Sequence, residues 1–168
     1  YFETLPANKI DLALDLEADR MVNSRFDPED VEAERTVILS EREGSENEPL
    51  FLLGEAVQMA AFDHHPYRYE VIGLKEDLRQ ITRDDLYHHY RRYYTPANAL
   101  IAAAGDFETG MMLEKIEQTF GHLPPGEVIR KEIPQEPPLA QERRVEVKGP
   151  GTTVFMHLAY RAPAANHP

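Results

Sequence analysis

Two acidic residues in the segment DPEDVEAERTVILSERE limit how this chain can fold. Glu34 and Glu41 lie seven positions apart, so a helix places them on one line, two turns from each other. At about 100° per residue, that line falls between Val37 on one side and Ile38 on the other, so the acids point the way the apolar residues point. Taking an unpaired carboxylate out of water is costly, so both groups require a cation, a metal ion or hydrogen-bond donors.

The residues alone leave two interpretations of this acid pair open. In the first, the carboxylates belong to a metal site, since carboxylate oxygens are ligands for zinc and similar cations. In the second, the apolar stripe is narrow, both acids lie at its edge, and Arg35 or Arg42 neutralises them there.

Composition excludes several classes of protein. A chain of 168 residues, 42% of them apolar, is long enough for one ordinary core, and it contains no run of about 18 apolar residues that would predict a membrane span. With 30 acidic and 18 basic residues, the net charge of −12 argues against binding to nucleic acid. There is no cysteine, so any metal must be held by histidine and carboxylate. We expect a soluble protein, cytoplasmic or periplasmic, with no further indication of the compartment.

Periodicity and capping signals predict an α+β fold in which an antiparallel sheet is packed by several helices. Helices are expected over 8–21, from Pro28 to about 45, and over 49–62, 84–94 and 109–120. Strands are expected at YFETL and at the apolar run NALIAAAG, which is predicted to be buried. Two further strands are expected on both sides of Gly149-Pro150-Gly151, joined there by a hairpin turn or a strand exchange. The Pro-rich stretch LPPGEVIRKEIPQEPPLAQ reads as an extended linker between them.

The segment ADRMVNSRFDPEDVEAERTVILSERE resembles part of the pitrilysin, insulinase and mitochondrial processing peptidase family of zinc peptidases. The resemblance continues through FDHHPYRYEVIG, the helix LYHHYRRYYTPANALIAAAGDF and the Pro-rich crossover, and so covers essentially the whole chain. In that family a helix carrying E-R-x-x-x-x-x-E supplies the third zinc ligand. The resemblance therefore implies that Glu41 is this ligand and that Glu34 is an acid that supports the site.

One departure from the family concerns the other half of the metal site. The family's two remaining ligands and its general base come from an H-x-x-E-H helix, and no histidine in this chain starts that pattern. The resemblance places the motif upstream of Tyr1, so we expect no catalytic residue here, and we expect this chain alone to be inactive and to bind zinc weakly if at all. The adjacent His64 and His65 are predicted to pack a loop, because neighbouring side chains diverge and supply at most one ligand.

The resemblance implies a fragment of a larger two-part peptidase fold: 1–123 as the last part of the first domain, 124–142 as a linker, and 143–168 as strands that begin the next half. The parent would be a zinc metalloendopeptidase that cleaves unfolded peptides or presequences bound as an added strand. Its expected partners are peptide substrate, the missing N-terminal segment, and a second homologous domain or subunit. The alternatives are a non-catalytic scaffold subunit of the same family and an unrelated acidic interaction module. Retention of Glu34 and Glu41 favours the peptidase.

Overall fold

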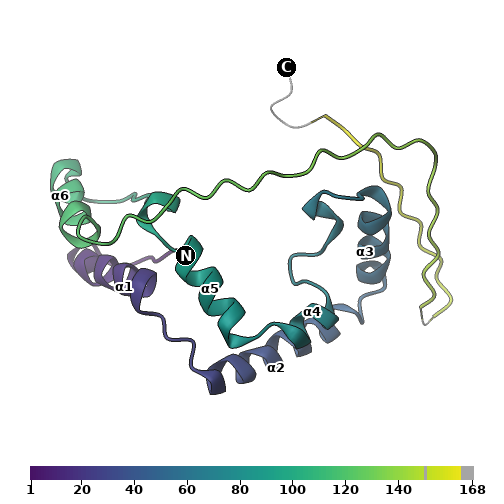
Figure 1. Cartoon of the computed structure of the whole chain (residues 1–168), viewed down its shortest axis with the longest axis horizontal. Coiled ribbons are helices and arrows are strands. Elements are labelled where there is room, and N and C mark those ends of the chain that lie inside the picture. Colours follow the sequence, from purple (N-terminus) through teal and green to yellow (C-terminus); the bar gives the residue numbers. More distant parts are fainter. Residues whose placement is uncertain (150, 164–168) are drawn as a thin grey trace. The chain divides into compact units, whose positions relative to one another are not determined.

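The computed structural model describes residues 1–149 and 151–163 (Figure 1). The chain divides into two compact units, each assembled from two separate stretches of sequence. The first unit contains residues 1–28 and 82–130, and the second contains residues 29–81 and the chain from 131 onward. Every regular element in the described ranges is a helix.

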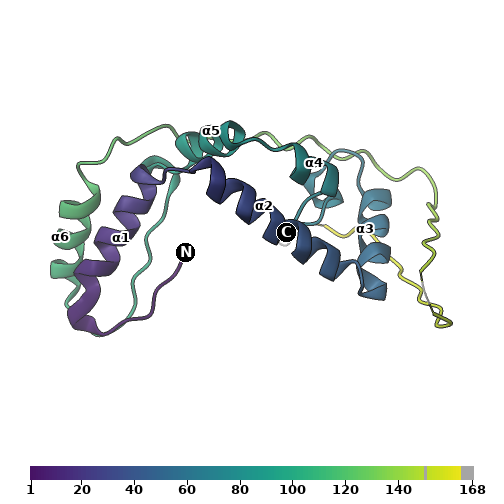
Figure 2. The same ribbon diagram turned by 90° about the horizontal axis from the view of Figure 1, so that it is seen from below.

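The first unit has a core between α1 and α6, which run side by side (Figures 1 and 2). Leu14 and Ala18 of α1 and Met112 of α6 are buried. Leu14 and Ala18 lie four residues apart, about one helical turn, so α1 turns one apolar face toward α6. The elements of this unit are η1 (Ala7–Lys9), α1 (Ile10–Asn23), α5 (Arg83–Tyr93), η3 (Pro96–Asn98) and α6 (Thr109–Phe120).

Capping residues in the sequence set the start of α5 and the end of α6. Thr82 and Asp85 form a reciprocal capping box at the start of α5, with each side chain accepting from the other's backbone N–H. Helix α6 ends at Gly121, where an added Cβ would lie 2.4 Å from the carbonyl oxygen of Glu117. A side chain at this position would therefore collide with the last turn of the helix.

Tyr90 of α5 is the most deeply buried aromatic side chain of the first unit, at 2% exposure. Its hydroxyl donates to the carbonyl oxygen of Arg20 at 2.9 Å and accepts from the backbone N–H of Ser24 at 3.1 Å. Its ring packs against those of Phe26 and Tyr94, each with centroids 5.2 Å away. The hydroxyl thus satisfies backbone groups at the end of α1, while the ring fills the core.

Replacing Tyr90 with Phe should lower the free energy of unfolding by about 1 to 2 kcal/mol, because the ring contacts remain while the Ser24 N–H loses its acceptor. The Arg20 carbonyl keeps the hydrogen bond from the Ser24 hydroxyl. Urea unfolding with unchanged m-value measures this loss. Tyr87→Phe is the matched control, since the Tyr87 ring also packs on Phe26. A variant as stable as the wild type would show that water replaces the hydroxyl at no cost.

The second unit is built on α2, which α3 follows after a short turn (Figure 2). Pro28 and Pro49 each occupy the first position of a helix, where the missing N–H costs nothing. The helices predicted from sequence are confirmed to within a few residues, whereas α4 was not predicted. From residue 131 the described chain is extended. The elements are α2 (Pro28–Ser45), α3 (Pro49–Ala61), η2 (Pro66–Arg68) and α4 (Lys75–Gln80).

The predicted α+β class with an antiparallel sheet is wrong for the described residues, which contain no strand. The segments expected to be strands are extended but unpaired, and a strand exists only where a neighbour bonds its backbone. Their apolar side chains are exposed, as at Phe2 (93%), Leu100 (89%) and Val154 (92%), so the expected burial of NALIAAAG is also wrong. The turn predicted at Pro150 and the last part of 143–168, residues 164–168, lie outside the described residues.

Candidate zinc-ligand helix

Helix α2 is attached to the rest of its unit through Arg42, whose side chain is 5% exposed. Both Nη atoms donate to the carboxylate of Glu55 on α3 at 2.7 Å, and Nη1 also donates to the carbonyl oxygen of Gly73 at 2.9 Å. Nε donates to Glu46 at 3.0 Å, and Lys75 Nζ reaches the same carboxylate at 2.6 Å. Hydrogen bonding to Glu55 raises the pKa of Arg42, and the bonds from Lys75 and Arg42 lower the pKa of Glu46. The network is therefore ionised, and its donors are paired.

Arg35 makes a second attachment, about two turns before Arg42 on α2. Its Nη1 donates to the carbonyl oxygen of Leu78, and its Nη2 donates to that of Ile81 at 2.6 Å. Nε and Nη2 also bind the carboxylate of Glu32, at 3.1 and 3.0 Å. With its side chain 16% exposed, Arg35 connects α2 to the two carbonyl groups at and just after the end of α4.

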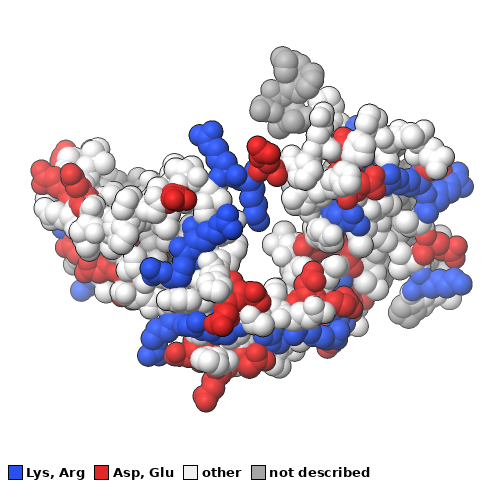
Figure 3. Space-filling model, viewed as in Figure 1, with Lys and Arg blue, Asp and Glu red and all other residues white. Residues whose placement is uncertain are grey.

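The two acids of the sequence motif lie on a different side of α2 from these arginines. Glu34 and Glu41 are exposed, and Val37 between them is 57% exposed. Within the described part of the chain, neither carboxylate accepts a hydrogen bond or forms an ion pair. The interpretation that Arg35 or Arg42 neutralises them is therefore wrong, because both arginines bind other groups. Figure 3 shows acidic and basic side chains interspersed along this helix.

The chemistry of this donor set agrees with part of a zinc site. An exposed carboxylate with no internal partner is available as an oxygen ligand, and zinc accepts Glu oxygen at about 2.0 to 2.2 Å. Two carboxylates do not complete a tetrahedral site, and no cluster of three or more His, Asp or Glu residues occurs in 1–149 and 151–163. Glu41 thus fits one ligand position of a zinc site, and such a site would need further ligands besides Glu34 and Glu41.

A second anionic group of the unit has its donors within the chain. The carboxylate of Glu136, in the extended linker, accepts from the backbone N–H groups of Asp63, His64 and His65, the last two at 2.8 and 2.7 Å. Arg161 Nη2 adds an ion pair at 3.1 Å. Burial opposes ionisation of Glu136, but the three N–H donors and Arg161 outweigh it and lower the pKa to about 2. Consecutive N–H groups aimed at one carboxylate form a nest that holds the linker on this loop.

Ionised Glu136 should attach the linker only above its folded pKa. Because that pKa lies below the ordinary value of 4.5, the stabilisation is fully present above about pH 4.5 and is lost as the pH falls toward 2. We expect a carboxyl carbon-13 NMR titration of Glu136 with a midpoint near 2. Glu136→Gln should expose the Asp63, His64 and His65 amides to hydrogen exchange at neutral pH, whereas Glu132→Gln, in the same linker, should not. A Glu136 midpoint above 4 would contradict the contact.

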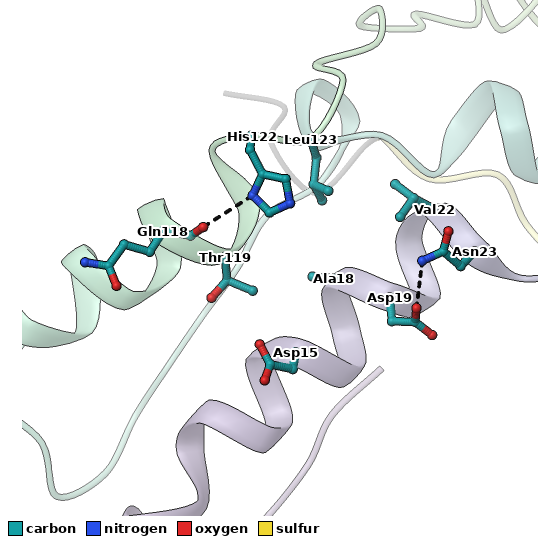
Figure 4. A pocket seen from close by; sticks show the side chains of 9 residues that line it. All are labelled: Asp15, Ala18, Asp19, Val22, Asn23, Gln118, Thr119, His122 and Leu123. Atoms are coloured by element: carbon teal, nitrogen blue, oxygen red, sulfur yellow. Dashed lines mark hydrogen bonds between the residues drawn. The ribbon is translucent and has the colours of Figure 1, made fainter.

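An open pocket of about 360 Å³ lies between α1 and α6 of the first unit (Figure 4). The amide of Asn23 donates to Asp19 at 2.7 Å, and His122 Nδ1 lies 3.3 Å from the carbonyl oxygen of Gln118. Asn23 and Asp19 thus pair with each other within α1, His122 lies beside the last turn of α6, and neither acid of α2 lines the pocket. Its lining residues are Asp15, Ala18, Asp19, Val22, Asn23, Gln118, Thr119, His122 and Leu123.

Two of these site features were not predicted from sequence. Glu55 pairs with Arg42 across 13 residues, and Glu136 reaches a loop more than 70 residues away. Nothing in the local pattern marks either partner. One signal was present: each acid of the motif is followed directly by an arginine, in Glu34-Arg35 and Glu41-Arg42. Successive residues on a helix point about 100° apart, so an acid and the arginine that follows it do not lie on the same side of α2.

Two family models match this chain. The model described as insulinase (peptidase family M16) matches residues 1–75, and the model described as peptidase M16 inactive domain matches residues 80–168. The helix with Glu34 and Glu41 lies within the first match. The second match extends over the linker and the extended C-terminal segments.

Relatives and solved structures agree with these models. A zinc protease of Mycobacterium leprae is 34% identical over 72% of this chain and 27% of its own length. A probable mitochondrial-processing peptidase subunit beta of Arabidopsis thaliana is 28% identical over 73% of this chain and 23% of its own length. The crystal structure of a protease from Helicobacter pylori superposes with a TM-score of 0.69 at 27% identity, covering 79% of this chain and 33% of that protein. The chain thus spans a third or less of these proteins, and it belongs to the insulinase family of peptidases, family M16.

Proposed function

We propose that this chain is part of a zinc metalloendopeptidase to which it contributes one metal ligand, Glu41. The observation that carries the proposal is that Glu41 is exposed and unpartnered on a helix whose neighbouring arginines are fully engaged elsewhere. A carboxylate without an internal partner is available to a cation. Glu34, on the same line of α2, would support the site by orienting a histidine ligand or holding the helix.

When bound, the zinc would polarise the scissile carbonyl and activate a water molecule. The part of this chain would be to present a carboxylate at a defined point. The other two ligands and the general base would come from an H-x-x-E-H segment that precedes residue 1 in the longer protein. This chain by itself would hydrolyse nothing and bind zinc weakly, because one or two carboxylates make a poor site for an ion that prefers nitrogen among four ligands.

The extended segments suggest how a substrate is bound. Unpaired backbone and exposed apolar side chains, as at Leu100 and Val154, are the features on which an unfolded peptide can add as a strand. We therefore propose unfolded peptides or presequences as substrates, and a second homologous domain or subunit as partner. Within the longer protein, 1–123 would complete the catalytic domain and 124–142 would connect it to the following half. In the described ranges no helix has the length and apolar character needed to cross a bilayer.

A non-catalytic subunit of the same family is the competing function. Such a subunit would have no use for two uncompensated carboxylates on one line of α2, which favours the peptidase. The deciding experiment uses the longer protein that contains this chain. Elemental analysis should find one zinc per protein, and cleavage of an unstructured peptide should stop on chelation and return with zinc. A protein that carries no zinc and cleaves nothing would leave the scaffold as the function.

A further inference from the structure

The acid pair of α2 is accompanied by an arginine pair with the same spacing. Glu34 and Glu41 are each followed by an arginine, and the structure turns the acids outward and the arginines inward. Within each pair the two residues are seven positions apart, which is about 10 Å along the helix axis. Each exposed carboxylate therefore lies one residue from a point at which α2 is attached to its unit.

The attachments fix α2 both along its axis and around it. Arg42 binds Glu55 of α3 through two parallel hydrogen bonds of 2.7 Å, a geometry that restricts the orientation of the guanidinium. It also donates to the Gly73 carbonyl, while Arg35 donates to the carbonyls of Leu78 and Ile81. One segment, residues 73–81, thus receives both arginines. A helix held at two points to the same segment cannot rotate without breaking one of them.

Rotation matters because a metal ligand tolerates little displacement. A Glu carboxylate lies several ångströms outside the helix backbone, so turning α2 by about 20° moves it by roughly 2 Å. That movement is as long as a zinc–oxygen bond, and coordination tolerates only about 0.2 Å. The attachment at Arg42 is the nearest to Glu41, and its partner Glu55 is 9% exposed. The position of the Arg42–Glu55 ion pair is therefore well defined, both by its burial and by the attraction between the two charges.

We infer that Arg42 and Glu55 are positioning residues for Glu41: their buried ion pair sets the direction in which α2 presents the zinc ligand. This inference rests on the proposed zinc-ligand role of Glu41. Neither residue touches the metal. Their effect passes through the helix backbone, so it should change the affinity and geometry of the metal site in protein that is fully folded.

The test uses the longer protein with Arg42→Lys, which keeps the charge but cannot span both Glu55 oxygens, and Glu55→Gln, which keeps the size but removes the charge. Both should weaken zinc affinity by about tenfold, measured by chelator competition well below the unfolding temperature. Both should also alter the visible absorption of the cobalt-substituted protein, which reports ligand geometry. Arg144→Lys, at an 87% exposed arginine paired with Glu142, should change neither.

Wild-type zinc affinity and an unchanged cobalt spectrum in both variants would overturn the inference. If Arg42→Lys does not fold, the milder Glu55→Gln decides by the same two measurements. Glu41→Gln is measured in parallel to separate this inference from the proposed function. If Glu41→Gln loses zinc while Arg42→Lys and Glu55→Gln bind it normally, only the positioning role fails. If Glu41→Gln itself retains zinc at wild-type affinity, the zinc-ligand role fails and the inference fails with it.

Discussion

Glu41→Gln should remove zinc from the longer protein and abolish peptide cleavage. An amide oxygen is a neutral and weaker ligand, and the loss of one of three protein ligands should lower zinc affinity by more than about a hundredfold, beyond the range typical of a supporting residue. Metal content by elemental analysis and turnover of an unstructured peptide measure the two effects. Because Glu41 is exposed and unpaired, the free energy of unfolding of the metal-free variant should lie within about half a kcal/mol of that of the metal-free wild type.

Glu34→Gln is the matched control on the same line of the helix. It leaves the proposed ligands in place, so zinc should be partly retained while activity falls more steeply than affinity. Equal losses in the two variants would make Glu34 a ligand and not a supporting acid. Normal zinc content in Glu41→Gln would contradict the assignment of Glu41. The unfolding measurement excludes a general loss of structure as the reason for either result.

Arg42→Met should destabilise the protein by about 3 to 5 kcal/mol. The substitution leaves Glu55, at 9% exposure, without the cation that neutralises it, and an uncompensated buried charge costs about this much. It also removes the bonds that Arg42 donates to Glu46 and to the Gly73 carbonyl, so Arg35 and Lys75 remain as the polar links between α2 and residues 73–81. The measurement is urea unfolding of the metal-free protein, which gives the free energy of unfolding for the transition in which α2 unfolds.

The double variant Arg42→Met, Glu55→Leu is the control for that prediction. It replaces both charges with apolar side chains, and such replacements of buried pairs are often neutral, so most of the lost stability should return. A single variant within about 1 kcal/mol of the wild type would show that water reaches Glu55. A double variant as unstable as the single one would place the cost in lost packing, including that of Arg42 on the Phe51 ring at 4.9 Å, and not in the unpaired charge.

Helices and their ends were predictable from sequence because their causes are local. Proline at the first position of α2 and α3, the Thr82–Asp85 capping box and the stop at Gly121 act within one turn of the chain. Helix α4 went unpredicted because six residues carry too little periodicity to register. The sheet was predicted wrongly for the opposite reason: apolar, β-branched segments favour extended backbone, but a strand also needs a neighbour to bond with.

The sequence by itself determined that two acids lie on one line of α2, in a segment that resembles an M16 peptidase. Tertiary structure decided everything that depends on residues distant in the chain. It turned Arg42 toward Glu55 and Gly73, left Glu41 free, and brought Glu136 to the amides of the loop at His64. Helical spacing follows from the backbone alone, whereas the choice of partner for a charge depends on which groups folding brings within about 3 Å.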